Sequence, residues 1–219
     1  MKKLFLFALA VTALFSSCEK DPDLNKLDSD YAVYTNYDNS IQFNKFSSYY
    51  LPDSILVAGG GMKAQYWKDE NAQKIISEVV AEMDDRGYIR VDDKEKADIG
   101  LQLSYAQQTT QIITPGYGYG YGWWGAGFWG PFWNDWYYPY PVSYSYDTGT
   151  FVAEMVDLTA KSADQNKKVD LPVIWHAYAS GLVYNNSRID MQLTLRAVEQ
   201  AFEQSPYLNI LINNKSGRL

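Results

Sequence analysis

The chain has 219 residues, of which 47% are hydrophobic and 21% charged, and its formal net charge is −7 at pH 7. This length is enough for one domain with a proper hydrophobic core. An acidic chain is a poor candidate for binding nucleic acid, or for docking on anionic lipid through charge. The sequence holds one cysteine, Cys18, so no disulfide can form within the chain.

The N-terminus has the features of a secretory signal. Lys2 and Lys3 precede the apolar run LFLFALAVTALF, which is too short to span a bilayer. The run ends in LFSSC, which resembles the lipobox of bacterial lipoproteins except at Phe15, where a smaller residue is usual. We therefore predict a signal peptide over 1–17 and a lipid anchor on Cys18. The anchor would hold the protein on the periplasmic or the surface side of the outer membrane; the alternative is an ordinary cleaved signal with a spare thiol.

A polar segment follows the anchor. Residues 18–30 contain EKDPDLNKLDSD, which is acidic and has no hydrophobic period, so we predict an extended, solvated tether. Acids directly behind the lipidated cysteine are also similar to the surface-export signal of some Gram-negative lipoproteins, although Lys20 and Pro22 interrupt them here. Removal of 1–17 leaves 17 basic against 26 acidic residues, a net charge of −9.

A folded domain is predicted over 31–207. It begins with the short strand candidates YAVYTNY and a piece near SILVA. A helix is then predicted within DENAQKIISEVVAEMDDRGY, where apolar residues from Ile75 to Met83 recur at helical spacing. Asp69 can cap the start of this helix, and Gly87 can end it in the left-handed conformation. The strand candidate YIRV lies just after it.

The rest of the domain contains three longer strand candidates and a second helix. ADIGLQLSYAQQTT alternates apolar and polar residues, and TFVAEMVDL and PVIWHAYASGLVYN are rich in β-branched and aromatic residues. A second helix is predicted within SRIDMQLTLRAVEQAFEQSP, with Ser187 and Asp190 as a capping box and Pro206 as its end. Residues 208–219 are expected to form a C-terminal tail. The order of elements predicts a single α+β domain, with a mostly antiparallel β-sheet, two helices packed on one face and a long Gly/aromatic-rich loop insertion.

That insertion, residues 115–146, holds fifteen aromatic residues, seven glycines and one charge, Asp135. Burial of the aromatic area and the ordering of so much backbone have nearly equal and opposite free energies. Full exposure would far exceed the few hundred Å² of apolar patch usual on a monomer. The insertion therefore either folds over the sheet face that the helices leave bare or forms an interaction surface. The candidate residues for that surface are Tyr117, Tyr119, Tyr121, Trp123, Trp124, Trp129, Trp133 and Trp136.

Several motifs carry a resemblance to a known family. They are RGYIRV, KADIGLQLSY, a Gly-Thr-strand-Asp pattern over 149–157 and W-x-A-x-A-S-G from Trp175 to Gly181. Over about residues 29–207 the chain resembles the bacterial lipoproteins catalogued as domain of unknown function 4136. It departs from them at His176, where typical members carry a basic residue, and at Ser205-Pro206. The resemblance implies a cell-envelope lipoprotein with no assigned enzymatic activity, and it supplies no catalytic residues.

The chain offers little for catalysis or metal binding. His176 is the only histidine, and strand alternation places it on the side of Ile174 and Tyr178, which favours a structural role. Glu154 and Asp157 fall on opposite faces of their strand and cannot act as a close acid pair. Neither MDDRG nor VDDKE follows the calcium-loop spacing. We therefore expect no catalytic residue, no metal and no cofactor.

Two function classes remain, with an enzyme as a less favoured third. In the first, the protein is a non-catalytic envelope component whose insertion contacts another envelope protein, a second copy or the headgroup layer. In the second, it is a binding module that stacks a glycan or another flat ligand on the Trp and Tyr side chains, with Asn134 and Asp135 as the only polar candidates in the insertion. A short Asp-Ser-Ile motif also makes Ser54 a candidate O-glycosylation site.

Overall fold

The computed structural model describes residues 31–58, 65–106, 110–114, 126–146, 149–164, 166–184 and 188–211. The strands are β1 (Ala32–Tyr37), β2 (Ser48–Tyr50), β3 (Ile55–Ala58), β4 (Gln65–Trp67), β5 (Ile89–Arg90), β6 (Ile99–Ala106), β7 (Thr110–Thr114), β8 (Trp133–Tyr137), β9 (Val142–Tyr146), β10 (Thr150–Asp157), β11 (Val169–Ser180), β12 (Val183–Tyr184) and β13 (Arg188–Ile189). The helices are α2 (Glu70–Asp85) and α3 (Met191–Glu203), with 3-10 turns η3 (Phe43–Lys45), η4 (Lys94–Lys96), η5 (Ala126–Trp129) and η6 (Pro206–Leu208). The predicted signal peptide and tether lie outside the described residues.

A mixed nine-stranded sheet organises the domain, with the path β1-β11-β10-β6-β2-β5 and with β3, β4 and β8 paired beside it. Two separate two-stranded sheets are formed by β7 with β9 and by β12 with β13. The central pairs of the large sheet, β1–β11, β11–β10 and β10–β6, are antiparallel. However, β2 and β3 both run parallel to β6, and β8 runs parallel to β11. The prediction of a mostly antiparallel sheet is therefore not confirmed. The chain crosses through α2 between β3 and β6, and such a crossover returns a strand in the direction of the one it left.

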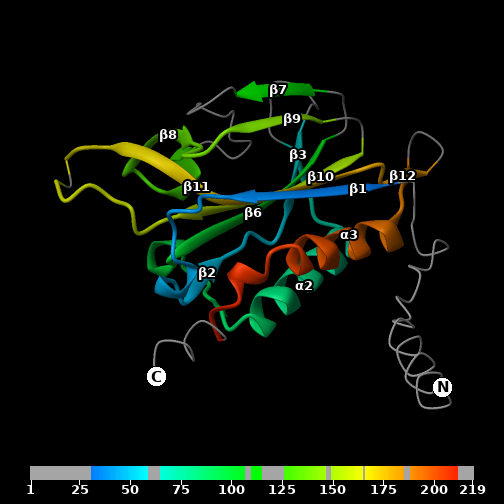
Figure 1. The fold of residues 1–219 in the computed structure, drawn as a ribbon, viewed down its shortest axis with the longest axis horizontal. Coiled ribbons are helices and arrows are strands. Elements are labelled where there is room, and N and C mark those ends of the chain that lie inside the picture. Colours follow the sequence, from blue (N-terminus) through cyan, green and yellow to red (C-terminus); the bar gives the residue numbers. More distant parts are fainter. Residues whose placement is uncertain are drawn as a thin grey trace, which may run out of the picture.

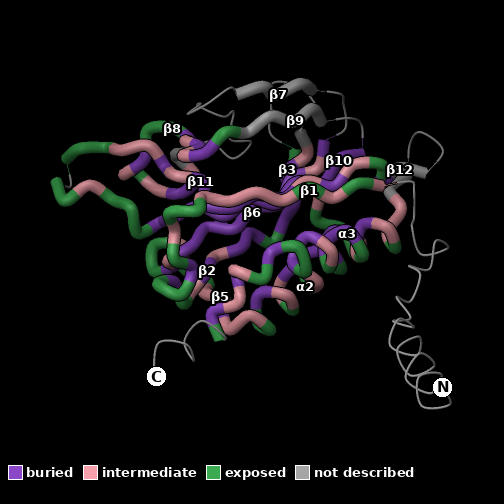
Figure 2. Tube along the Cα trace, viewed as in Figure 1, coloured by how far each residue is buried: buried purple, intermediate pink, exposed green. Residues whose placement is uncertain are grey.

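Both helices cover the same face of the sheet, as predicted (Figure 1). Figure 2 shows buried positions lining the space between this face and the helices. From α2, Ile75, Val79 and Met83 are buried there, and from α3, Val198 and Phe202. Their periodic spacing in the sequence is the reason that both helices were predictable, because one apolar stripe must meet an apolar sheet face.

The ends of α2 are capped as predicted from the sequence, whereas α3 begins at a different residue from the one predicted. The Asp69 side chain accepts hydrogen bonds from the backbone N–H groups of Asn71 and Ala72 at 2.9 and 3.0 Å, and Gly87 follows α2 with a φ of 92°. In α3, Asp190 is itself the N-cap and accepts from Gln192 N–H at 2.9 Å. The residues before it form β13, so the predicted capping box begins too early, and its Ser187 lies outside the described residues.

The motifs behind the family resemblance are built into the core. Trp175 is fully buried against Phe202, with ring centroids 5.5 Å apart, and its indole Nε1 donates to Ser205 Oγ at 2.9 Å. The small side chains of Ala177 and Ala179, which follow on β11, belong to the same helix-side cluster. The motif from Trp175 to Gly181 therefore contributes to the packing between the sheet and the helices.

The chain end also belongs to the core. Leu208 is 0% exposed and Ile210 6% exposed, both within the cluster between helices and sheet. The Ile210 N–H donates to the backbone carbonyl of Arg86 at 3.1 Å. The prediction of a tail from residue 208 is therefore wrong for 208–211, because a short apolar run after Pro206 is long enough to fill the end of the helix layer.

A register shift in β11 changes which side chains share a face. Met155 of β10 pairs with Trp175, but the next residue, Val156, pairs with Val173, so Ile174 is an extra residue on β11. In such a bulge two consecutive residues oppose one on the partner strand. Ile174 and Trp175 consequently both belong to the helix-side cluster. The prediction that His176 shares a side with Ile174 is wrong for this reason.

Candidate functional site

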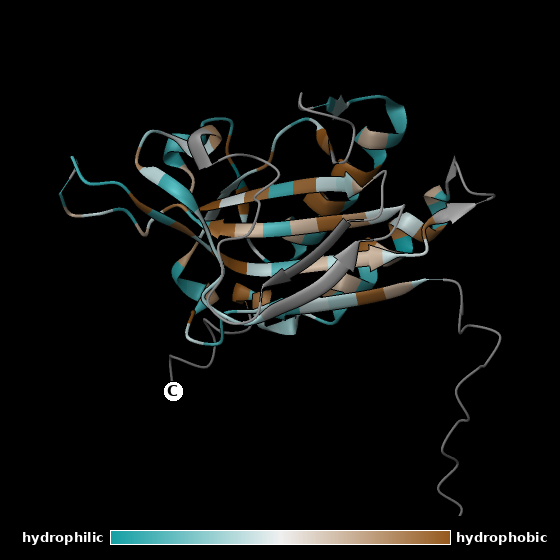
Figure 3. Ribbon diagram, turned by 90° about the horizontal axis from the view of Figure 1, so that it is seen from above, coloured by the Kyte–Doolittle hydropathy of each residue, from teal (hydrophilic) through white to brown (hydrophobic). Residues whose placement is uncertain are grey.

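The described half of the aromatic insertion covers the face of the sheet opposite the helices. β8 pairs with β11, with Trp133 next to Val169 and Trp136 next to Leu171. Apolar positions alternate with polar ones along the long strands, as Figure 3 shows. A second hydrophobic cluster forms over this face, and its aromatic members are Trp129, Trp133, Trp136, Tyr138 and Tyr140.

This placement corrects part of the predicted interaction surface. Trp129, Trp133 and Trp136 are only 3%, 2% and 0% exposed. For these three residues the prediction of an exposed surface is wrong, because they pack over the sheet face that the helices leave bare. The other five candidates, and Cys18, lie outside the described residues: Tyr117, Tyr119, Tyr121, Trp123 and Trp124.

Gly100 lets the insertion approach the sheet closely. A Cβ added to Gly100 would lie 2.5 Å from the ring of Trp129 and 2.7 Å from Val156. The absence of a side chain at this point of β6 is therefore what admits the Trp129 ring. The same ring meets Tyr50 of β2 edge-on, with centroids 6.2 Å apart.

A buried carboxyl group lies beneath this cover. Glu154 of β10 is 1% exposed, and its two oxygens accept hydrogen bonds from the Tyr138 hydroxyl and from the Gln102 side-chain amide. Burial raises the pKa of Glu154, and the two hydrogen bonds oppose that rise. Through Tyr138, the insertion thus supplies one of the two hydrogen bonds that offset the cost of burying the Glu154 carboxyl group.

His176 lies next to Glu154 in the strand register and is also buried. The Tyr140 hydroxyl lies 3.1 Å from His176 Nδ1, and the two rings are stacked with centroids 5.6 Å apart and planes 5° from parallel. Burial lowers the pKa of His176 to about 3, so the imidazole is neutral at physiological pH. The structure supports the predicted structural role, because solvent does not reach the ring.

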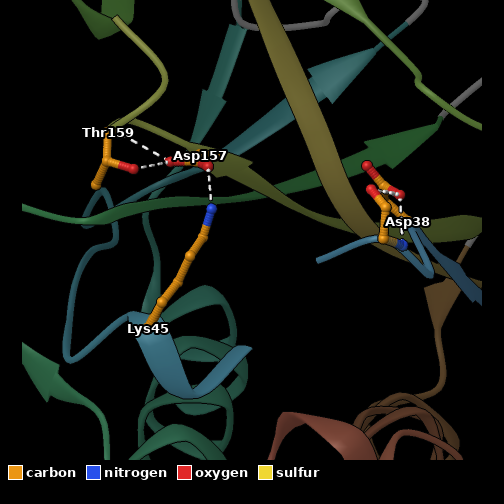
Figure 4. A network of polar contacts seen from close by, with 5 residues as sticks. Asp38, Lys45, Asp157 and Thr159 are labelled. Atoms are coloured by element: carbon orange, nitrogen blue, oxygen red, sulfur yellow. Dashed lines mark hydrogen bonds and ion pairs between the residues drawn. The ribbon is translucent and has the colours of Figure 1, made fainter. Parts of the chain in front are cut away.

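Asp157, the other acid on β10, stands on the opposite face, as strand alternation predicted. It accepts from Lys45 Nζ at 3.0 Å and from the backbone N–H of Thr159 at 2.8 Å (Figure 4). The carboxylate thereby ties η3 to the end of β10, although the lysine is 44% exposed. In the same view, Asp38 caps its own turn by accepting from Ser40 N–H at 2.9 Å.

An open groove runs beside the first residues of the described insertion. It has a volume of about 340 Å³, within the range of small-ligand sites. We call it the Tyr66 groove, and it is lined by Tyr50, Pro52, Asp53, Ser54, Tyr66, Lys68 and Phe128. The sequence did not reveal this groove, because its residues come from β2, the turn between β2 and β3, β4, the turn after β4, and η5.

Ser54, the candidate glycosylation site, lies in this groove but is only 7% exposed. A modifying enzyme would need the segment before β3 to open, so the structure disfavours this residue as an acceptor. A second open groove, of about 390 Å³, lies between α2 and α3, where the charged side chains of Glu70, Lys74 and Glu78 line it. It offers no aromatic side chain.

The described part of the chain offers neither a cluster of metal ligands nor a membrane-spanning helix. Its His, Cys, Asp and Glu side chains form no cluster of three or more able to hold a metal ion. None of its helices is long and apolar enough to cross a membrane.

The fold is thus an α+β domain in which one mixed sheet lies between two helices and an aromatic cover. A family model described as a domain of unknown function, DUF4136, matches residues 33–207, so the chain belongs to this family. A crystal structure of a DUF4136 family protein from Bacteroides thetaiotaomicron VPI-5482 is 39% identical, with a TM-score of 0.69 over 84% of this chain and 100% of that one.

A second solved structure is far less similar. It is the PelC dodecamer from Paraburkholderia phytofirmans, 9% identical, with a TM-score of 0.39 over 82% of this chain and 97% of that one. At that TM-score no statement about this chain follows from it. A comparison with curated protein sequences found no significant match.

Proposed function

We propose that this protein is a lipid-anchored component of the cell envelope, held on the outer membrane through Cys18, and that it acts by binding rather than by catalysis. The observation that carries the binding role is the contrast between two places near the insertion. Glu154 and His176 are sealed beneath the aromatic cover, whereas the Tyr66 groove offers aromatic and charged side chains to solvent. The partner in this proposal is another envelope protein or a second copy of the chain.

Metabolic labelling with an alkyne fatty acid tests the anchor. The full chain, expressed with its signal peptide, is expected to incorporate the label and to fractionate with the outer membrane. Because Cys18 is the only cysteine, no other thiol can be acylated, and the Cys18→Ser variant should carry no label. Equal labelling of both chains, or none of the wild type, would overturn this part of the proposal.

Photo-crosslinking in cells tests the interaction role. A photoreactive amino acid replaces Tyr121, within the candidate residues that lie outside the described structure, and in a second chain it replaces Glu78 on α2 as a control. We expect a discrete crosslinked protein from position 121 and none from position 78. Absence of an adduct at position 121, with the protein folded and anchored, would count against the insertion as an interaction surface.

The second candidate function is the binding of a glycan or another flat ligand. The Tyr66 groove is the observation that favours it, because the aromatic side chains there stand beside charged groups. Asp53 and Lys68 supply polar partners in the groove, in addition to the few that the insertion contains. This candidate therefore moves from the Trp residues of the insertion to its border with β4.

A further inference from the structure

We propose that the Tyr66 groove is a binding site for a neutral carbohydrate. This inference rests on the second candidate function above and adds the class of ligand, the location and the residues. The groove differs from the aromatic cluster under the insertion because it is open, and it differs from the groove between α2 and α3 because aromatic rings line it.

The apolar part of the groove consists of three rings from separate elements. Tyr66 of β4 is 48% exposed, which is unusual for a large side chain in this domain. Tyr50 and Phe128 are partly buried and complete the wall. The C–H face of a pyranose ring is apolar and weakly positive, and it therefore suits the negative face of an aromatic ring.

The polar part of the groove supplies hydrogen-bonding groups of both signs. The Asp53 carboxylate is held by Arg90 Nη2 at 2.7 Å and remains 86% exposed at its side chain. Lys68, also exposed, lines the same groove. Sugar hydroxyl groups both donate and accept, so they can pair with the carboxylate and the ammonium group together. Arg90 already neutralises Asp53, which leaves the exposed Lys68 as the single charge in excess. One exposed lysine attracts an anionic ligand only weakly in water, so the aromatic walls and the hydrogen-bonding groups favour a neutral polyhydroxylated ligand.

Two of the three aromatic walls, Tyr50 and Phe128, are held in place by contacts within the domain. Tyr66 sits on a strand that pairs with β3, opposite Leu56. Tyr50 rests against the buried ring of Trp129, and Lys94 holds Phe128 both by a hydrogen bond to its carbonyl oxygen and by a cation–π contact of 4.5 Å. Fixed walls lower the entropic cost of binding, because fewer side chains must be ordered.

Binding of the mature chain, extracted in detergent, to a printed array of neutral and acidic oligosaccharides tests this assignment. The strongest neutral oligosaccharide is then titrated by isothermal calorimetry against the wild type, Tyr66→Ala and Tyr34→Ala. Tyr34 is a matched control, since it is a tyrosine on another edge strand and 46% exposed, but it lies outside the groove. We expect Tyr66→Ala to weaken binding about tenfold or more, as loss of a central aromatic contact does, and Tyr34→Ala to leave it unchanged.

Three results would overturn the assignment. They are an array on which no neutral oligosaccharide is retained, retention of acidic oligosaccharides alone, and equal affinity of the Tyr66→Ala and wild-type chains. An Asp53→Asn variant keeps the test informative if Tyr66→Ala fails to fold, and it should also weaken binding while leaving far-ultraviolet circular dichroism unchanged. None of these results bears on the anchor or on the crosslinks from position 121, so those two parts of the main proposal can stand or fall separately.

Discussion

The buried imidazole of His176 should make this domain lose stability in mild acid. Its folded-state pKa is lowered by burial from 6.5 to about 3, so between those values the unfolded chain binds a proton that the folded chain excludes. The stabilisation is complete above pH 6.5 and is lost as the pH falls. Each pH unit inside this window corresponds to about 1.4 kcal/mol, so acidification to about pH 5 should remove about 2 kcal/mol.

The opposite shift of Glu154 must be separated from this effect. Its raised pKa means that the folded state keeps a proton longer, so its contribution is present below the unfolded value of 4.5 and is lost as the pH rises. A His176→Asn variant isolates the histidine, since an asparagine side chain offers a polar atom near the position of Nδ1, which faces Tyr140. We expect the difference in unfolding free energy between wild type and variant to shrink by about 2 kcal/mol between pH 6.5 and about pH 5.

Urea denaturation at several pH values measures this difference. Nuclear magnetic resonance provides a check that does not depend on the variant folding, because a chain with one histidine gives one imidazole C2–H signal. That signal should not titrate between about pH 7.5 and about pH 4.5. A titration midpoint near 6.5 would show that solvent reaches the ring, and it would refute the sealed position of His176.

Two further substitutions test the packing and the helix ends. Gly100→Ala places a Cβ against the Trp129 ring and should lower the unfolding free energy by about 1–3 kcal/mol. Ser104→Ala on the same strand is its control, since the Ser104 hydroxyl is buried and has no hydrogen-bond partner in the described structure, and its loss should be neutral or slightly stabilising. Equal effects of the two would contradict the close approach of Trp129. Asp69→Ala removes the N-cap of α2 and should lower the unfolding free energy by about 1 kcal/mol. Glu70→Ala, which removes an exposed ion pair with Lys74, should lower it by only a few tenths of a kcal/mol. Urea denaturation distinguishes the two variants, and an unchanged midpoint for Asp69→Ala would contradict the cap.

The helices and the long strands were predictable because their burial is periodic in the sequence. The stripe from Ile75 to Met83 and the alternation in β6 each reveal a face that must meet a core. The strand directions were not predictable, because β2, β3 and β8 are short and the pairing of such strands depends on crossovers. The bulge at Ile174 was likewise not predictable, because neighbouring residues of the strand are apolar and their pattern does not show where the alternation shifts.

The role of the insertion depended on a balance that sequence cannot resolve. The free energy gained by burying its aromatic side chains is nearly equal to the cost of ordering its backbone. For residues 126–141, the fit of Trp129 over Gly100 and the pairing of β8 with β11 favour the buried arrangement. The Tyr66 groove could not be predicted at all. Its residues are far apart in the sequence, and each of them alone is an ordinary surface or loop residue.

Our central proposal gives the insertion two roles: residues 126–141 cover the sheet, and the aromatic residues over 117–124 contact a partner. Two full-length chains test it together: Trp136→Ala, and a chain in which the aromatic residues at 117, 119, 121, 123 and 124 are all replaced by serine. Loss of the fully buried Trp136 side chain should lower the unfolding free energy by about 3–5 kcal/mol.

If the proposal is right, the five-serine chain should unfold within about 0.5 kcal/mol of the wild type, because substitutions on an interaction surface change stability little. It should also lose the crosslinks to envelope protein; for this measurement the photoreactive residue occupies position 121 in both chains, so serine stands only at the other four positions. The opposite pattern, an unstable five-serine chain with its crosslinks intact beside a Trp136→Ala chain of wild-type stability, would contradict the claim.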